Sequence, residues 1–167
     1  MTTYDDLHRA HRGRVTRLCR VLLADEDEAA DVAQDVFAKL HQAFTTDPRT
    51  IEWPAWLTRV TVNACRDRRR SGWWRWWRER GVDLDSAGLR STIRTPEDEV
   101  IGRETQLRIW AAIRRLPLRQ REVFALRQME GLSTDAVAAA LGITAGSVKQ
   151  HLFRAVAHLR RAVGDDA

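Results

Sequence analysis

The sequence predicts an all-α fold made of two small helical domains, and three observations support this prediction. Apolar residues recur at helical spacings along nearly the whole chain, and no segment shows a convincing strand pattern. The periodicity stops between residues 81 and 95, where the composition is typical of a linker. The last part of the chain shows a helix, a glycine-containing turn and a second helix. We therefore expect a helical domain over residues 1–80, a flexible linker over 81–95 and a helix-turn-helix domain over 96–167.

The first predicted helix begins after Thr3, whose hydroxyl can cap it, with Asp5 and Asp6 near the positive end of the helix dipole. Its apolar stripe consists of Leu7, His11, Val15, Leu18 and Leu22. Because His11 lies on that stripe, we interpret it as a packed histidine and not as a ligand.

The second predicted helix starts in the acidic residues 25–28 and runs to about Phe44. Its apolar face consists of Ala33, Val36, Phe37 and Leu40. Asp31, Gln34 and Asp35 share the opposite face at spacings i, i+3 and i+4. Such a face is either a solvated acidic surface or a surface that binds a basic partner.

The third predicted helix follows a polar loop, "TTDPRTIEW", and has Pro54 in its first turn. The residues expected to face inward are Trp53, Leu57, Val60 and Ala64. The other side carries a polar and basic strip formed by Arg59, Asn63, Arg66 and Arg70.

The C-terminal domain is expected to begin with two further helices. "TPEDE" predicts a helix with Thr95 as its cap and Pro96 in its first position. This helix ends at Pro117, and its apolar residues are Trp110, Ile113 and Leu116. The next helix covers about residues 118–130 and stops at Gly131.

The strongest single motif is "LSTDAVAAALGITAGSVKQHLFRAVAHL", which predicts two helices capped by Ser133 and Thr144 with Gly142 between them. The residues that would hold these helices together are Val137, Leu141, Ile143, Val148 and Leu152. The outer face of the second helix carries Lys149, Gln150, Phe153 and Arg154, where a recognition helix contacts base edges in the major groove. Residues 144–163 include four bases and no acid, which favours DNA binding over a plain helical hairpin.

Charge is unevenly distributed along this chain of net charge +5. Residues 24–38 hold six acids and no base, whereas residues 66–80 hold seven arginines and two acids. This asymmetry indicates two surfaces with different partners. Cys19 and Cys65 lack the spacing of a zinc site, so we expect two reduced, buried thiols. No signal peptide and no apolar run near the ~20 residues of a membrane span is found, so we expect a cytoplasmic protein.

Three blocks of sequence, in this order, resemble the extracytoplasmic-function sigma factors, the promoter-recognition subunits of bacterial RNA polymerase. They are "AADVAQDVFAKL", "WPAWLTRVTVNACRDRRR" and "LPLRQREVFALRQMEGLSTDAVAAALGITAGSVKQHLFRA". The resemblance covers nearly the whole chain except the linker. It implies that core RNA polymerase and promoter DNA are the partners, with no cofactor, no metal and no enzymatic activity of the chain itself. Members of this family are often held inactive by an anti-sigma factor, so such a partner is implied too.

The resemblance also implies which residues make these contacts. The polymerase-binding residues would be Asp31, Gln34 and Asp35. The residues for the −10 element would be Asn63, Arg66, Asp67 and Arg70, and the loop of residues 45–53 would capture a base flipped out of the duplex. The residues for the −35 element would be Lys149, Gln150, Phe153 and Arg154. The loop sequence, Gln150 and His151 depart from the common family pattern, so the resemblance does not specify the promoter sequence.

Two other classes of function compete with this one. A stand-alone helix-turn-helix regulator would need neither the acidic face of the second helix nor the strip on the third. A nucleic-acid enzyme has no support, because the acids show no paired metal-binding arrangement and no Ser, Cys or His lies in a nucleophile motif.

The segment "SGWWRWWRERG" holds four tryptophans beside arginines: Trp73, Trp74, Trp76 and Trp77. Clustered indoles most often pack within a protein or against a protein partner. Stacking on single-stranded DNA and binding to a membrane surface are the alternatives.

Overall fold

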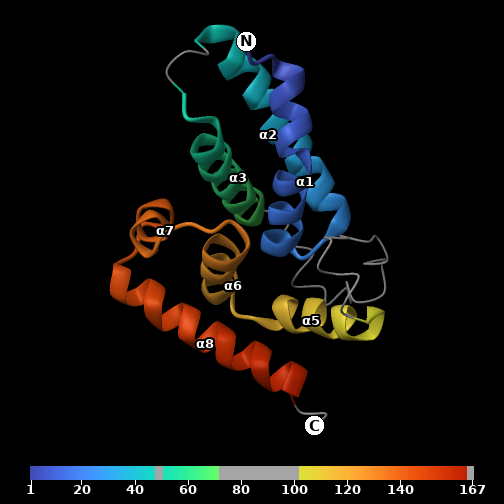
Figure 1. Ribbon diagram of the computed structural model, residues 1–167, viewed down its shortest axis with the longest axis vertical. Coiled ribbons are helices and arrows are strands. Elements are labelled where there is room, and N and C mark those ends of the chain that lie inside the picture. Colours follow the sequence, from blue (N-terminus) through green and yellow to red (C-terminus); the bar gives the residue numbers. More distant parts are fainter. Residues whose placement is uncertain (48–50, 72–101, 165–167) are drawn as a thin grey trace. The chain divides into compact units, whose positions relative to one another are not determined.

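The computed structural model describes residues 1–47, 51–71 and 102–164, and every regular element in these ranges is helical (Figure 1). The chain divides into two compact units, Met1–Ser91 and Thr92–Ala167. The predicted linker, 81–95, lies outside the described residues, so its bounds stay a prediction. The tryptophan segment and the helix start at Thr95 also lie outside them.

The described part of the N-terminal unit contains three helices: α1 (Tyr4–Leu23), α2 (Glu26–Thr46) and α3 (Trp53–Arg70). Each of them packs against the other two. Their interface is apolar, and its most fully buried side chains include Leu22, Leu23, Leu40, Leu57 and Val62. Burying such side chains is the main favourable term in forming a bundle of this size. The bundle therefore presents the polar sides of α2 and α3 outward.

Two caps define where α1 and α2 begin. Thr3 forms a capping box with Asp6, in which the Asp6 backbone N–H donates to Thr3 Oγ1 (3.2 Å) and the Thr3 N–H donates to Asp6 Oδ2 (2.9 Å). The side chain of Asp25 accepts from the backbone N–H of Glu28 (2.9 Å). The helix starts expected at Thr3 and in the acids of residues 25–28 are confirmed. His11 is half-buried, and burial together with the charge of Arg14 lowers its pKa.

The buried face of α3 differs from the predicted one. Leu57 and Ala64 are buried as expected, but Trp53 and Val60 remain partly exposed. The structure also buries two hydroxyl residues and two further apolar ones: Thr58, Thr61, Val62 and Cys65. A threonine can be buried in a helix when its hydroxyl donates to the carbonyl four residues earlier. Thr61 does so to Leu57 O (2.6 Å), and Thr58 does so to Pro54 O (3.1 Å).

Both cysteines are buried and neither forms a disulfide, as expected. Cys19 on α1 and Cys65 on α3 interact with each other through a hydrogen bond, which together with burial raises the pKa of the Cys19 thiol. A thiol with a raised pKa is a poor nucleophile, so this pair has the character of core packing.

The described part of the C-terminal unit contains α5 (Arg103–Arg115), α6 (Leu118–Phe124), a π-helical turn η3 (Ala125–Met129), α7 (Thr134–Leu141) and α8 (Ala145–Gly164). The long helix α8 contacts α5, α6 and α7 (Figure 1). Its buried residues are Val148 and Ala155.

The helix predicted over residues 118–130 is regular only to Phe124. Its last turn is widened, and the Glu130 N–H donates to Ala125 O at 3.0 Å, five residues back. Gly131 follows with φ of 68°, a left-handed conformation that glycine adopts without strain. The predicted stop at Gly131 is therefore confirmed, whereas the π-helical turn was not expected.

The helix-turn-helix is formed by α7 and α8. Ser133 accepts from the backbone N–H of Ala136, and Thr144 accepts from that of Ser147, each at 3.1 Å. Gly142 ends α7 with φ of 66°. Of the five residues expected between the helices, Val137, Leu141 and Val148 are buried, and the other two are half-buried. None of the described helices is long and apolar enough to cross a membrane.

Candidate functional site

The outer face of α2 carries Asp31, Gln34 and Asp35, and all three are exposed. The neighbouring residues Val32, Ala33 and Val36 are buried in the bundle, which fixes the direction in which the polar side chains project. The face expected to be polar is therefore open to solvent.

A groove of about 850 Å³ runs between α2 and α3 beside this face. Its lining consists of Glu28, Asp31, Val32, Asp35, Ala38, Lys39, Ala64, Asp67, Arg68 and Ser71. Four of these residues are acids and two are bases, so the groove is acidic on balance. Gln34 is not among the lining residues, whereas Asp67, which we grouped with the −10 residues, is.

Arg68 is the centre of the charge network in this groove. Its guanidinium donates from Nη1 to Glu28 Oε2 (2.8 Å) and from Nη2 to Asp31 Oδ2 (3.2 Å), and Nη2 lies 3.6 Å from Asp35 Oδ2. Burial alone would lower the pKa of Arg68, but the charges of Glu28 and Asp31 outweigh it and the pKa is raised. The guanidinium therefore stays charged and links α3 to three carboxylates of α2.

The sequence interpretation missed Arg68, although its spacing signals its position. It stands four residues after Ala64 and seven after Thr61, both of which are buried. Extending the inward face of α3 by one turn therefore points Arg68 at α2 and not at solvent.

The polar strip of α3 lies on the side away from the bundle core. Asn63, Asp67 and Arg70 are exposed and Arg66 is half-buried. One turn separates each of the exposed residues from the next, so one extended ligand could contact all three. The arrangement provides hydrogen-bonding groups of both kinds and one cation for an anionic ligand.

The loop before α3 is described only in part, because residues 48–50 lie outside the described ranges. Aromatic rings flank it: the ring centroids of Phe44 and Trp53 lie 5.9 Å apart, and Trp53 packs edge-on against Trp56 at 5.6 Å. All three rings are half-buried. The expectation that the loop captures a base stays a prediction.

The outer face of α8 brings together the four residues expected there. Lys149, Gln150, Phe153 and Arg154 are all exposed, and Phe153 has 77% of its surface open to solvent. Among the described residues, no hydrogen bond or ion pair involves the side chain of Lys149 or Arg154. An exposed aromatic ring beside two cations offers an apolar contact and positive charge together, which suits a polyanion with apolar edges.

His151 lies on the side of α8 next to α6. It is half-buried, and burial followed by the charges of Arg119 and Arg154 lowers its pKa. Arg119 is itself held by an ion pair of 3.0 Å with the buried Glu122. A neutral His151 therefore limits the positive charge behind the outer face of α8.

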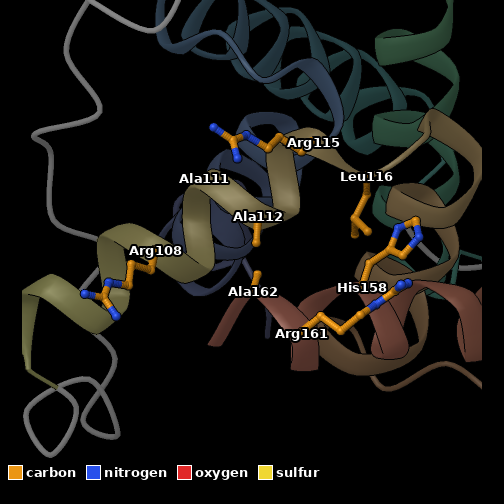
Figure 2. A pocket seen from close by; sticks show the side chains of 8 residues that line it. All are labelled: Arg108, Ala111, Ala112, Arg115, Leu116, His158, Arg161 and Ala162. Carbon is orange, nitrogen blue, oxygen red and sulfur yellow. The ribbon is translucent and has the colours of Figure 1, made fainter. Parts of the chain in front are cut away.

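A second hollow lies between α5 and α8 (Figure 2). Neither Lys149 nor Phe153 lines it. Its lining consists of four apolar residues, Ala111, Ala112, Leu116 and Ala162, and four basic or titratable ones, Arg108, Arg115, His158 and Arg161. None of its lining residues is acidic. Among the described residues, no group of three or more His, Cys, Asp and Glu side chains is arranged to hold a metal ion.

Comparison with known families places two family models on this chain. The model for Sigma-70 region 2 matches residues 7–75, and the model for Sigma-70 region 4 matches residues 106–159. The first therefore covers α2, α3 and most of α1, and the second covers α7 and most of α8.

The curated relatives match over most of their length. The ECF RNA polymerase sigma factor SigM of Mycobacterium tuberculosis is 30% identical, over 96% of this chain and 77% of the relative. The RNA polymerase sigma-E factor of Streptomyces coelicolor is 30% identical, over 94% of this chain and 84% of the relative.

Two solved structures share the fold. One is the sigma factor RpoE in complex with the anti-sigma factor NepR from Bartonella quintana, with a TM-score of 0.66, 22% identity and 96% of each chain covered. The other is CnrH in complex with the cytosolic domain of CnrY, with a TM-score of 0.61, 24% identity and 98% and 89% covered.

Proposed function

The chain belongs to the extracytoplasmic-function sigma factors of RNA polymerase, and on that basis we propose that it binds core RNA polymerase and directs promoter-specific transcription initiation. In this proposal the N-terminal unit binds polymerase and the −10 element, and the C-terminal unit binds the −35 element. The observation that carries the proposal is that matches to regions 2 and 4 occur in order in one chain. A stand-alone helix-turn-helix regulator would not require the match over residues 7–75.

The polymerase-binding face is the acidic face of α2, formed by Asp31, Gln34 and Asp35. Its exposure and the excess of acids in the adjoining groove support this assignment, because a basic helical partner would be attracted to it. The partner would supply apolar contacts as well, since charge steers the encounter more than it holds the complex.

The −10 element meets the strip formed by Asn63, Arg66, Asp67 and Arg70. Asn63 and Asp67 can hydrogen-bond to the edges of unpaired bases, while the arginines can bind phosphates. The aromatic rings of Trp53 and Trp56 lie at the start of the same helix. Opening the duplex costs a few kcal/mol per base, which these contacts would have to offset.

The −35 element meets the outer face of α8, formed by Lys149, Gln150, Phe153 and Arg154. These residues lie in the first half of the helix, which is the part of a recognition helix that enters the major groove. Arg160 and Arg161 lie further along α8 and would meet phosphates or solvent.

The chain acts without catalysis of its own, because polymerase performs the chemistry. An anti-sigma factor is the proposed negative regulator, supported by the related fold of RpoE, which was solved in complex with the anti-sigma factor NepR. The cytoplasm is the proposed location, since polymerase acts there. The proposed domain bounds are 1–80 and 96–167, with 81–95 between them.

Run-off transcription tests the proposal directly. Core polymerase is combined with the purified chain and a genomic fragment library, and the transcript starts are mapped. The proposal predicts starts that depend on the chain and share two elements upstream. A chain that binds DNA but yields no dependent transcript would instead indicate the stand-alone regulator.

A further inference from the structure

Arg68 contacts three acidic residues of α2, Glu28, Asp31 and Asp35, from the side of α2 that faces α3. Its side chain is only 23% exposed, and that of its first partner, Glu28, is 12% exposed. The side chains of Asp31 and Asp35 are 64% exposed. One guanidinium thus contacts one largely buried carboxylate and the inner edge of two exposed ones.

This geometry fixes where the exposed carboxylates lie. Asp31 and Asp35 stand one turn apart on α2 and carry the same charge, so without a cation between them they repel each other. The Nη2 atom of Arg68 is close to both, 3.2 Å from Asp31 Oδ2 and 3.6 Å from Asp35 Oδ2. The planar guanidinium presents Nη1 to Glu28 and Nη2 to Asp31 and Asp35 in one fixed arrangement, whereas a lysine offers one nitrogen on a flexible stem.

We propose that Arg68 is a positioning residue of the polymerase-binding face, which holds Asp31 and Asp35 so that their outer oxygens meet a basic partner together. This inference rests on the proposed function of that face. It gives Arg68 a role different from that of its neighbours Arg66 and Arg70, which we assign to DNA. Preorganised groups lose less freedom on binding, so removing Arg68 should shorten the lifetime of the complex.

Two effects of removing Arg68 oppose each other and can be separated by kinetics. The groove would become more acidic, which favours the approach of a basic partner at low salt. Asp31 and Asp35 would lose the guanidinium that holds them both, which speeds dissociation of the complex with polymerase. We expect Arg68→Met to raise the dissociation rate from core polymerase about fivefold to tenfold without slowing association. Arg68→Lys keeps the charge and should lie between this variant and the wild-type chain.

The test is a double-mutant cycle on core-polymerase affinity. Arg68→Met is measured in the wild-type chain and in a chain with Asp31→Asn and Asp35→Asn. If Arg68 acts through these carboxylates, its effect should vanish in the second background. The matched control is Arg69→Met, which removes the same charge from the next residue, whose Nη1 donates to Leu22 O on α1.

Loss of folding is controlled by circular dichroism and by a second variant, Arg68→Met with Glu28→Gln, which leaves no unpaired charge at Glu28. An equal effect of Arg68→Met in both backgrounds, or unchanged or tighter binding, would overturn the positioning role. The pair Asp31→Arg and Asp35→Arg serves as a further arm. If that pair binds as tightly as the wild type, the docking face itself is wrong. If it binds weakly and Arg68→Met does not, only the role of Arg68 is wrong.

Discussion

Helices α3 and α8 both carry several basic residues, but the two helices direct them differently. On α3, Arg68 pairs with acids of α2 and Arg69 donates to Leu22 O of α1 at 2.8 Å. On α8, Lys149 and Arg154 are exposed, and their side chains make no ion pair or hydrogen bond to the described residues. The residue type is nearly the same in the two places. What differs is whether a neighbouring helix supplies a hydrogen-bond acceptor. Where it does, the basic side chain stabilises the fold, and where it does not, the side chain is open to bind a partner.

The largest expected effect of breaking this contrast is on −35 recognition. Arg154→Ala should relax sequence preference at one or two positions of the element, because a base-edge contact provides ~1–3 kcal/mol of discrimination. A binding selection on randomised −35 DNA measures this, with Arg160→Ala as the matched control on the same helix. If the selected motif is intact in Arg154→Ala and altered in Arg160→Ala, the face of α8 has been assigned wrongly.

A smaller effect is expected on stability, and it should appear only on α3. Arg68→Met breaks partly buried ion pairs and should lower the free energy of unfolding of the N-terminal unit by about 1–2 kcal/mol. Arg154→Met removes an exposed, unpaired charge and should change stability by less than about 0.5 kcal/mol. Urea unfolding of both variants compares them, and equal losses would mean that the contrast between the helices has no energetic basis.

Within α3 itself, Asn63 should behave unlike Arg68. Asn63 is exposed, so Asn63→Ala should leave stability and polymerase binding intact while it reduces promoter opening about tenfold, as expected for one lost base contact. Permanganate reactivity of unpaired thymines reports opening, and a gel-shift titration reports the closed complex. Equal loss in both assays would restrict this strip to duplex binding.

The smallest effect belongs to the far end of α8. Arg160→Ala should weaken binding to all −35 sequences alike and reduce the slope of log affinity against log salt by about 0.9, which corresponds to one phosphate contact. A salt titration on two unrelated duplexes measures this. A change on one duplex alone would mean that Arg160 contributes to sequence recognition.

Local signals in the sequence predicted much of the fold. Caps at Thr3, Ser133 and Thr144, and the stop at Gly142, depend on hydrogen bonds and backbone conformations within a few residues, so the sequence alone was sufficient to place them. The apolar periodicity was enough to predict helices throughout the described ranges.

Features that depend on a neighbouring helix were not predicted. Thr58 is buried partly because Arg14 of α1 donates to its hydroxyl at 2.9 Å, which periodicity in α3 cannot indicate. The π-helical turn at Ala125–Met129 was also not predicted. Arg68 was grouped with a basic segment, because its partners on α2 stand 33 to 40 residues away in sequence. The exposure of Asp31, Gln34 and Asp35 was predictable from the faces of α2, whereas the ion pairs that Arg68 makes with Asp31 and Asp35 were not predicted.

The most direct test of the account is whether the two units divide polymerase binding and −35 binding between them. The measurement compares the wild-type chain with the variant Asp31→Arg, Asp35→Arg in two titrations, one with core polymerase and one with a −35 duplex. We predict that affinity for core polymerase falls by roughly tenfold to 100-fold, as expected when like charges meet across an interface. Helicity and duplex affinity should stay unchanged. Undiminished affinity for core polymerase, or an equal loss in both titrations, would contradict the account.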